Sequence, residues 1–341
     1  MAGDPPTASD LNVLLVGVGR WGEHHLRVLR ELGIGTWVAA RSAERRDWAI
    51  AQGVEPARVL SDYRDALDAV DAVDVVTPAD SHAPIATTSL EHGRHVLVEK
   101  PLAMTAEEGR RLETVAARVG RVLQVGHIYR FHPVTAALQA VLRAERLGRI
   151  RFATGRFAGF KRPRTDVGIT QTDAMHWFDL FAYLFDRRAS AVTSVQRDHL
   201  GRGLDDYSVS VVRYGDIEAT IEADYFTPGT HRVCTVVGDR ATLVADYGAN
   251  RLVLHAGEHH AHEGQWRADA GAVEDIPIAG GEPLCLEIAS FLAACAEGRP
   301  AAVSADAGVH ALEIVEAAAR SARTAQTVSV HPEIAEHRAR P

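Results

Sequence analysis

Residues Val13 to His25, which read VLLVGVGRWGEHH, constrain the fold of this chain more than any other stretch. They begin with a short apolar run typical of a buried parallel strand, and an amphipathic helical pattern follows that stops at Gly33. Gly17, Gly19 and Gly22 stand between the two in a GxGxxG spacing. The first permits a tight turn, the second lets backbone approach a pyrophosphate, and the third lets helix and strand pack closely.

This strand, turn and helix predict a dinucleotide-binding site. A pyrophosphate would lie on free N–H groups at the positive end of the helix dipole. Arg20 and Trp21 belong to the turn and are therefore expected at the cofactor. The alternative interpretation is a glycine-rich turn in an ordinary α/β domain.

Strands and helices alternate through the first third of the chain. Further strands are expected at Thr36–Ala40, Arg58–Leu60, Val73–Thr77, His95–Val98 and Val122–Val125. Helices are expected at about Ala43–Gln52, Asp62–Ala69, Pro84–His92 and Ala106–Val119, the last with Thr105 and Glu108 in capping-box spacing. This order predicts an α/β fold with a doubly wound parallel sheet, a Rossmann domain over residues 1–126.

The pattern changes in residues 127–330, where longer alternating strands predict an α+β domain with an open-faced, mostly antiparallel sheet. The expected strands are Ile150–Phe160, Ala191–Gln196, Tyr207–Tyr214, Ile217–Phe226, Arg232–Val237, Ala241–Tyr247 and Arg251–His255. The expected helices are Pro133–Arg146, Thr172–Phe185, Leu284–Ala296 and Asp306–Arg323. Residues 331–341 are expected to form a disordered tail.

Composition narrows the class of protein. A length of 341 residues favours two domains, and a net charge of −8 argues against binding nucleic acid. No apolar run is long enough to span a membrane, and the N-terminus lacks the pattern of a signal peptide. Three cysteines without CxxC spacing indicate a reducing compartment, so a cytoplasmic protein is expected. The histidine-rich stretch His255–His262 is interpreted as a polar hairpin tip, and no metal site is predicted.

The end of the second strand bears on the choice of cofactor. An NAD-binding domain usually carries an acid about 20 residues after the glycines, which holds the ribose 2′-OH. Here Ala40 stands at that place, followed by Arg41 and Ser42, which would suit a 2′-phosphate. NADP is therefore favoured over NAD. The alternative is a solvated arginine and a serine that caps the next helix.

The fifth strand ends in Glu99-Lys100-Pro101. Ligands of open α/β sheets bind at the carboxyl ends of strands, which would place Lys100 over the nicotinamide. A lysine held there would polarise a carbonyl or donate a proton to it, with a pKa lowered by desolvation. The proline restricts the backbone of Lys100 and is a candidate for a cis peptide bond. Taken alone, this tripeptide is more often just a turn.

At this point the sequence resembles the glucose–fructose oxidoreductase, inositol dehydrogenase and rhizopine-catabolism (Gfo/Idh/MocA) family of NAD(P)-dependent dehydrogenases. The resemblance covers nearly the whole chain and is most specific around Glu-Lys-Pro. It rests on Val16–Gly22 with His25, Thr77-Pro78 with His82, Gly93–Pro101, Val125–Phe131, Gly148–Ile150 and His176–Leu180.

The resemblance implies the positions of the site. Lys100 takes the place of the catalytic lysine and His176 that of the proton-transfer histidine. The family often has Asp four residues before that histidine; here Thr172 stands there and Asp173 lies three before, so Asp173 is the candidate to orient His176. Thr172 and Asp173 are also expected near the substrate, as are Lys100, His176 and Tyr129. The matching positions Thr77, Pro78, His82 and Glu99 are expected at the cofactor.

A basic loop, Lys161-Arg162-Pro163-Arg164, precedes the helix of His176. Three neighbouring cations would suit a phosphate or diphosphate on the substrate, with Arg162 and Arg164 gripping its oxygens. The alternative is a solvated loop.

These features predict an enzyme that moves hydride between nicotinamide and a secondary alcohol or ketone of a sugar-like substrate. His176 would take the hydroxyl proton while Lys100 stabilises the developing oxyanion. The family implies a sugar, amino sugar, nucleotide sugar or cyclitol; the details favour C3 of a nucleotide-linked amino sugar. It also implies a homo-oligomer, a dimer or tetramer formed through the open sheet face. The alternatives are a non-catalytic dinucleotide-binding sensor and a relative that acts on a non-sugar substrate.

Overall fold

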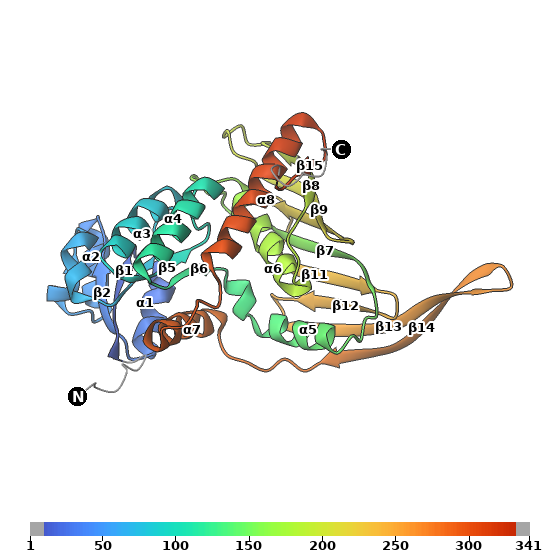
Figure 1. Cartoon of the computed structure of the whole chain (residues 1–341), viewed down its shortest axis with the longest axis horizontal. Coiled ribbons are helices and arrows are strands. Elements are labelled where there is room, and N and C mark those ends of the chain that lie inside the picture. The colour runs from blue at the N-terminus through green and yellow to red at the C-terminus, as the bar shows by residue number, and fades with distance from the viewer. Residues whose placement is uncertain (1–9, 332–341) are drawn as a thin grey trace. The chain divides into compact units, whose positions relative to one another are not determined.

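The computed structural model describes residues 10–331, so most of the predicted tail lies outside the described residues (Figure 1). The chain forms two compact units, and each is described by itself. The first contains the chain up to Ile128 together with Glu282–Val309, and the second contains Tyr129–Gly281 and the chain from His310.

The first unit is built on a six-stranded parallel sheet of order β3-β2-β1-β4-β5-β6, which confirms the doubly wound Rossmann fold. Its central strands are buried on both faces because helices cover the sheet. The strands are β1 Asn12–Val16, β2 Gly35–Ala39, β3 Val59–Leu60, β4 Ala72–Val75, β5 His95–Glu99 and β6 Leu123–Gly126.

The helices of the first unit are α1 Gly22–Glu31, α2 Ala43–Ala51, α3 His82–Glu91, α4 Ala106–Val119 and α7 Pro283–Glu297. The capping box of α4 is confirmed, since Thr105 and Glu108 each bond the other's backbone N–H. Apolar residues of α7 pack with α1 and β1 in one core, so a late segment completes the unit. The helix expected at Asp62–Ala69 is wrong in type: Tyr63–Ala69 is a 3₁₀ helix, capped by Asp62.

The second unit is built on a nine-stranded sheet of order β14-β13-β12-β11-β7-β10-β9-β8-β15. Only β7 and β10 pair in parallel, so the sheet is mostly antiparallel, as expected. The strands are β7 Ile150–Gly159, β8 Ala191–Arg197, β9 Tyr207–Tyr214, β10 Ile217–Asp224, β11 Thr230–Gly238, β12 Ala241–Asp246, β13 Arg251–His262, β14 Gln265–Ile276 and β15 Val328–Ser329.

Helices lie on one face of this sheet, and buried and exposed residues alternate along β7 to β12. A Cβ at Gly155 of β7 would lie 2.8 Å from the ring of Trp177, so the glycine lets α6 sit close. The other face stays open, with Phe152, Val195 and Val211 among its exposed residues. The helices are α5 Pro133–Arg143, α6 Met175–Phe185 and α8 Ala305–Thr324, the last divided between the two units at Val309.

Two predictions for the second unit are wrong in detail. The helix expected at Thr172–Phe185 begins with a π-helical turn, Thr170–Ala174, ahead of α6. The stretch His255–His262 belongs to a polar hairpin, as expected, but it is not a turn: it is the second part of β13 and pairs with β14, a strand not predicted from the sequence. The reason is that nearly every residue of β14 is exposed, so the strand lacks the apolar alternation of a half-buried strand.

Candidate active site

The carboxyl ends of the parallel strands bring the predicted cofactor residues to one edge of the first sheet. Strand β1 leads into Gly17, β2 into Arg41, β4 into Thr77 and β5 into Lys100. Because all strands of a parallel sheet point the same way, these positions share an edge although they are far apart in sequence.

The glycine turn matches the three roles expected from its spacing. Gly17 has a φ of +96°, and a Cβ there would lie 2.8 Å from the carbonyl oxygen of Val76. A Cβ at Gly22 would lie 2.1 Å from the carbonyl oxygen of Gly17, which forbids any side chain. A Cβ at Gly19 would meet no described atom within 4 Å, so open space adjoins the backbone there. The turn therefore fits a pyrophosphate, with Arg20 and Trp21 exposed beside it.

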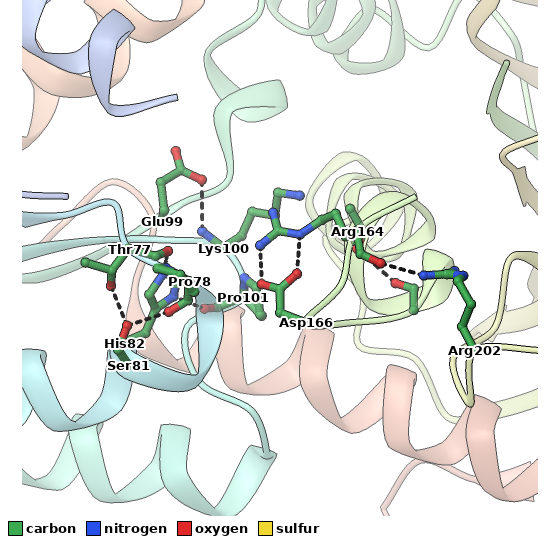
Figure 2. Close-up of polar contacts among 12 residues, drawn as sticks. Thr77, Pro78, Ser81, His82, Glu99, Lys100, Pro101, Arg164, Asp166 and Arg202 are labelled. Atoms are coloured by element: carbon green, nitrogen blue, oxygen red, sulfur yellow. Dashed lines mark hydrogen bonds and ion pairs between the residues drawn. The ribbon is translucent and has the colours of Figure 1, made fainter. Parts of the chain in front are cut away.

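Lys100 is held at the end of β5 by its neighbours. The Glu99 carboxylate accepts a 3.1 Å hydrogen bond from the backbone N–H of Lys100, and the Lys100–Pro101 peptide is cis. The ring nitrogens of buried His82 lie 2.7 Å from the carbonyl oxygen of Pro101 and 2.8 Å from that of Thr77, linking the ends of β5 and β4 (Figure 2). The side chain of Lys100 itself is half-buried.

Thr77 and Pro78 form the neighbouring loop after β4. The Ser81 hydroxyl lies 2.8 Å from that of Thr77 and 2.7 Å from the carbonyl oxygen of Pro78, which tightens the turn into α3 (Figure 2). Pro78 is exposed and precedes a short 3₁₀ turn, Ala79–Ser81. Both residues thus lie at the expected edge.

A buried charge network lies behind Lys100. Nδ1 of His25 is 2.7 Å from the Asp74 carboxylate and its Nε2 is 3.4 Å from that of Glu99, with the His25 ring fully buried. The Trp21 indole N–H donates a 2.7 Å hydrogen bond to the same Glu99 oxygen. Burial opposes a charge on His25, but the two carboxylates outweigh burial and raise its pKa to about 10. Burial likewise opposes a charge on Glu99, but the His25 cation and Lys100 lower the pKa of that carboxyl.

Helix α7 adds one more acid to this region. Glu287 is fully buried, and burial, together with the negative charge of Glu99, raises its pKa well above the usual range. Its backbone carbonyl accepts a hydrogen bond of 3.2 Å from the side chain of Gln124 on β6. A neutral Glu287 leaves the His25 cation balanced by Asp74 and Glu99 alone.

The residues after β2 have the features of the alternative interpretation, a solvated arginine and a serine that caps the next helix. The Ser42 hydroxyl accepts a 3.2 Å hydrogen bond from the backbone N–H of Arg45 and caps α2. The Arg41 side chain is exposed, while its carbonyl accepts a bond from Arg46. Ser42 therefore has a structural role, and the exposed Arg41 stays a prediction for contact with a 2′-phosphate.

In the second unit, His176 lies near the start of α6 among aromatic rings. Its ring is stacked on Phe157 at 5.2 Å between centroids, and the ring of Tyr129 lies 4.8 Å away. The guanidinium of Arg232 lies 3.4 Å from the centre of the Phe157 ring. Burial raises the pKa of Tyr129 to about 12, so its phenol stays protonated at neutral pH.

The carboxylates flanking His176 have cationic partners. Asp173, buried in the π-helical turn, accepts a 2.6 Å hydrogen bond from Nζ of Lys161. Asp179, also buried, forms a two-point ion pair with Arg130, which anchors α6. Thr172 donates its hydroxyl to the carbonyl of Gly168 at 2.8 Å.

The basic loop is less free than its sequence suggested. Arg164 forms a two-point ion pair with Asp166, and its carbonyl accepts a 2.6 Å bond from Arg202 (Figure 2). Lys161 is paired with Asp173, while the side chain of Arg162 is exposed. Two of the three cations are therefore already paired with carboxylates, and Arg162 is the better candidate of the two arginines.

Three residues of these environments were missed from the sequence: Asp74, Glu287 and Arg232. The first two left a signal, because each is an acid within an otherwise apolar strand or helix face. Arg232 left none, because its place over Phe157 arises from the pairing of β11 with β7.

The fold and these residues define a dehydrogenase with a Rossmann domain and an α/β second domain. Residues 11–127 match the NAD-binding Rossmann fold of the Gfo/Idh/MocA oxidoreductase family, and residues 140–330 match its C-terminal α/β domain. The chain therefore belongs to this family of NAD(P)-dependent oxidoreductases, which act on CH–OH groups of sugars. No helix within residues 10–331 is both long and apolar enough to cross a membrane.

Individual relatives resemble the whole chain. Inositol 2-dehydrogenase of Acidothermus cellulolyticus is 27% identical over 96% of both chains. The structure of levoglucosan dehydrogenase in complex with NADH and levoglucosan superposes with a TM-score of 0.81 at 23% identity, over 94% of this chain and 99% of the other. The structure of a UDP-N-acetylglucosamine 3-dehydrogenase of Acidithiobacillus ferrooxidans superposes with a TM-score of 0.79 at 24% identity, over 92% of this chain and 98% of the other. The last two show a shared fold.

Proposed function

We propose that this protein catalyses hydride transfer between NADP and a secondary alcohol or ketone of a ring-shaped, sugar-like substrate. The observation that carries the proposal is Lys100, held by Glu99 at the same sheet edge as the glycine turn, in a chain of this family. Residues 1–126 would bind the cofactor and residues 127–330 the substrate.

The cofactor would be held by residues of the sheet edge. The pyrophosphate would lie against the backbone from Gly17 to Gly22, where open space adjoins Gly19. The exposed Arg41 would meet the 2′-phosphate that distinguishes NADP from NAD. When bound, the nicotinamide accepts or supplies the hydride.

Lys100 and His176 would handle the proton and the charge on the reacting oxygen. In the oxidative direction His176 takes the hydroxyl proton and the Lys100 ammonium stabilises the developing oxyanion. Asp173 is bound to Lys161, so it would act on the site as part of that pair. Tyr129, protonated and beside His176, would donate a hydrogen bond to the substrate.

The substrate is proposed to be a cyclitol or sugar, within which a nucleotide-linked amino sugar oxidised at C3 is the finer hypothesis. The similarity to an inositol dehydrogenase over 96% of the chain supports the broader class. The exposed Arg162 supports the finer one, because a guanidinium suits a diphosphate. The three cysteines are free, which agrees with a cytoplasmic location, and the open sheet face is proposed to join copies of the chain.

The test is a screen of the purified protein with NAD and with NADP against free sugars, their nucleotide-linked forms and cyclitols. Reduction of the nicotinamide is followed by its absorbance. We expect turnover of at least one polyhydroxylated ring, faster with NADP, and loss of that turnover in Lys100→Ala. Binding of either cofactor without turnover of any ring substrate in either direction would favour the sensor alternative.

A further inference from the structure

The far end of the β13–β14 hairpin, here named the arm, consists of residues 257–270. Beyond Ala256, strand β13 pairs only with β14, because its ladder with β12 ends there. Every residue from Glu258 to Asp275 is exposed, and the hairpin extends past the rest of its sheet (Figure 1). A two-stranded hairpin without a covered face is marginally stable in water, so an arm of this length needs a further partner.

The two faces of the arm differ in chemistry. Directly opposite residues of an antiparallel pair share a face. One face carries His259, small residues and Trp266, which is 76% exposed, from the pairs Gly257–Ala270, His259–Ala268 and Ala261–Trp266. The other face carries the pairs Glu258–Asp269, His260–Arg267 and His262–Gln265. The arm thus resembles one layer of a sheet whose second layer and next strand are not supplied by the described chain.

The charged face is poorly matched within one copy. Glu258 lies opposite Asp269, two negative charges, and His260 lies opposite Arg267, two basic groups. Like charges directly opposite are destabilising. A diagonal contact offsets part of this cost, since Nδ1 of His260 lies 3.2 Å from the Asp269 carboxylate. Strand β14 is also the edge of its sheet, so one side of its backbone has N–H and C=O groups open to another strand.

We propose that two copies of this chain pair through the arm, β14 against β14, antiparallel about a two-fold axis at Ala268. In this register Arg267 of each copy lies opposite Asp269 of the other, and Trp266 lies opposite Ala270. Asp269 of each copy then faces a guanidinium, and two ion pairs between the copies offset the like-charge pairs within each arm.

The proposed partner is a second copy of this chain, because two antiparallel copies of β14 place opposite charges against each other. Arg267 and Asp269 stand symmetrically about Ala268, so one two-fold contact satisfies both at once. The product is a four-stranded ribbon with a largely apolar face, and three or more strands with such a face are the condition for a stable small sheet. This contact uses the sheet edge, whereas assembly through the open face of the same sheet would leave the arm unpaired.

The test uses two charge variants of the full-length protein, measured alone and mixed. Arg267→Asp places acid opposite acid in the proposed register, and Asp269→Arg places guanidinium opposite guanidinium. In an equal mixture, a copy of one variant facing a copy of the other has two attractive pairs. Sedimentation of each sample over a dilution series gives the dissociation constant of pairing.

We expect each variant alone to raise that dissociation constant by at least about tenfold, and the mixture to restore it. The variants change exposed residues, and circular dichroism checks that each is folded. Masses of both variants equal to that of the unaltered protein at every dilution would overturn the proposal, and this is also the result if copies join through the open face alone. Weakening without rescue in the mixture would overturn the register.

Cysteine cross-linking tests the axis independently. Ala268→Cys places two thiols opposite each other at the axis, so mild oxidation should yield a covalent dimer. Ala272→Cys, on the same strand, would face Gly264 of the other copy and serves as the matched control. The native cysteines control for background, since two of them are buried. Equal dimer yields from the two variants, or none from Ala268→Cys, would contradict the proposal.

Discussion

Each unit of this protein buries a carboxylate against a cation, and the two pairs differ in the cation used. In the first unit Asp74 and Glu99 are balanced by His25, and in the second Asp179 is balanced by Arg130. An imidazole titrates within the range of ordinary solution conditions, whereas a guanidinium does not. The first network therefore depends on pH and the second does not.

This difference separates the roles of the two networks. Glu99 bonds the backbone of Lys100, so the charge state of His25 bears on the residue proposed to carry the chemistry. Arg130 connects the segment after β6 to α6 within the second unit, so we expect a structural effect from its loss. Five predictions follow from these environments, and the first two test this comparison directly.

Removing one partner of either network should cost the most. His25→Gln leaves two buried carboxylates without their cation, and Asp179→Ala leaves a largely buried guanidinium without its anion. Each should lower the free energy of unfolding by about 3–5 kcal/mol, because the remaining charge is uncompensated. Denaturant titration measures this, with His24→Gln, an exposed neighbouring histidine, as the control.

The pH dependence distinguishes the two networks. The pKa of His25 in the folded protein, about 10, exceeds the ordinary value of 6.5, so its contribution is complete below about pH 6.5 and is lost as pH rises toward 10. The cost of His25→Gln should therefore shrink over that interval, while that of Asp179→Ala stays constant. A cost of His25→Gln that does not change with pH would show that His25 is not the cation of this network.

Lys100→Ala should lower turnover by at least about 10²-fold, because it removes a charge that matters mainly in the transition state. Binding of the cofactor, followed by quenching of protein fluorescence, should change little. Lys100→Arg keeps the positive charge but cannot release a proton, so it should recover only part of the loss. Turnover near that of the unaltered protein would contradict the proposed role of Lys100.

Arg41→Ala should weaken the binding of NADP by about 1.5–3 kcal/mol and the binding of NAD much less, because it would remove a charged hydrogen bond to the 2′-phosphate. Ser42→Ala is the matched control: it removes the cap of α2 and should affect both cofactors alike. Dissociation constants for the two cofactors give the comparison. Equal weakening by Arg41→Ala would show that this side chain does not read the 2′ position.

The smallest effect is expected in the basic loop. Arg162→Ala should raise KM for a nucleotide-linked sugar by about tenfold and change kcat less, because the contact exists in ground and transition states alike. Arg164→Ala should have less effect on KM, since Arg164 is already paired with Asp166. Added salt should reduce the effect of Arg162. An unchanged KM for both linked and free sugars would leave the loop as a solvated surface.

Local patterns were enough to predict much of this molecule. The glycine turn, the alternation of strands and helices, and the capping box of α4 depend on residues close in sequence, where spacing encodes geometry. Both the Rossmann sheet and the mostly antiparallel sheet were predicted in this way. The 3₁₀ helix at Tyr63–Ala69 and the π-helical turn were not, because small differences in hydrogen bonding leave no periodic signal.

What the sequence by itself determined is the order of elements and the set of polar residues at the ends of the parallel strands. Only the tertiary structure decided which charges meet: His25 reaches Asp74 across 49 residues, and α7 returns to the first unit to bury Glu287. It also decided that β14 is a strand, because the strand is stabilised by hydrogen bonds to β13 and its exposed residues show no apolar alternation in the sequence. Contacts between distant residues arise from packing, and packing is not encoded by spacing along the chain.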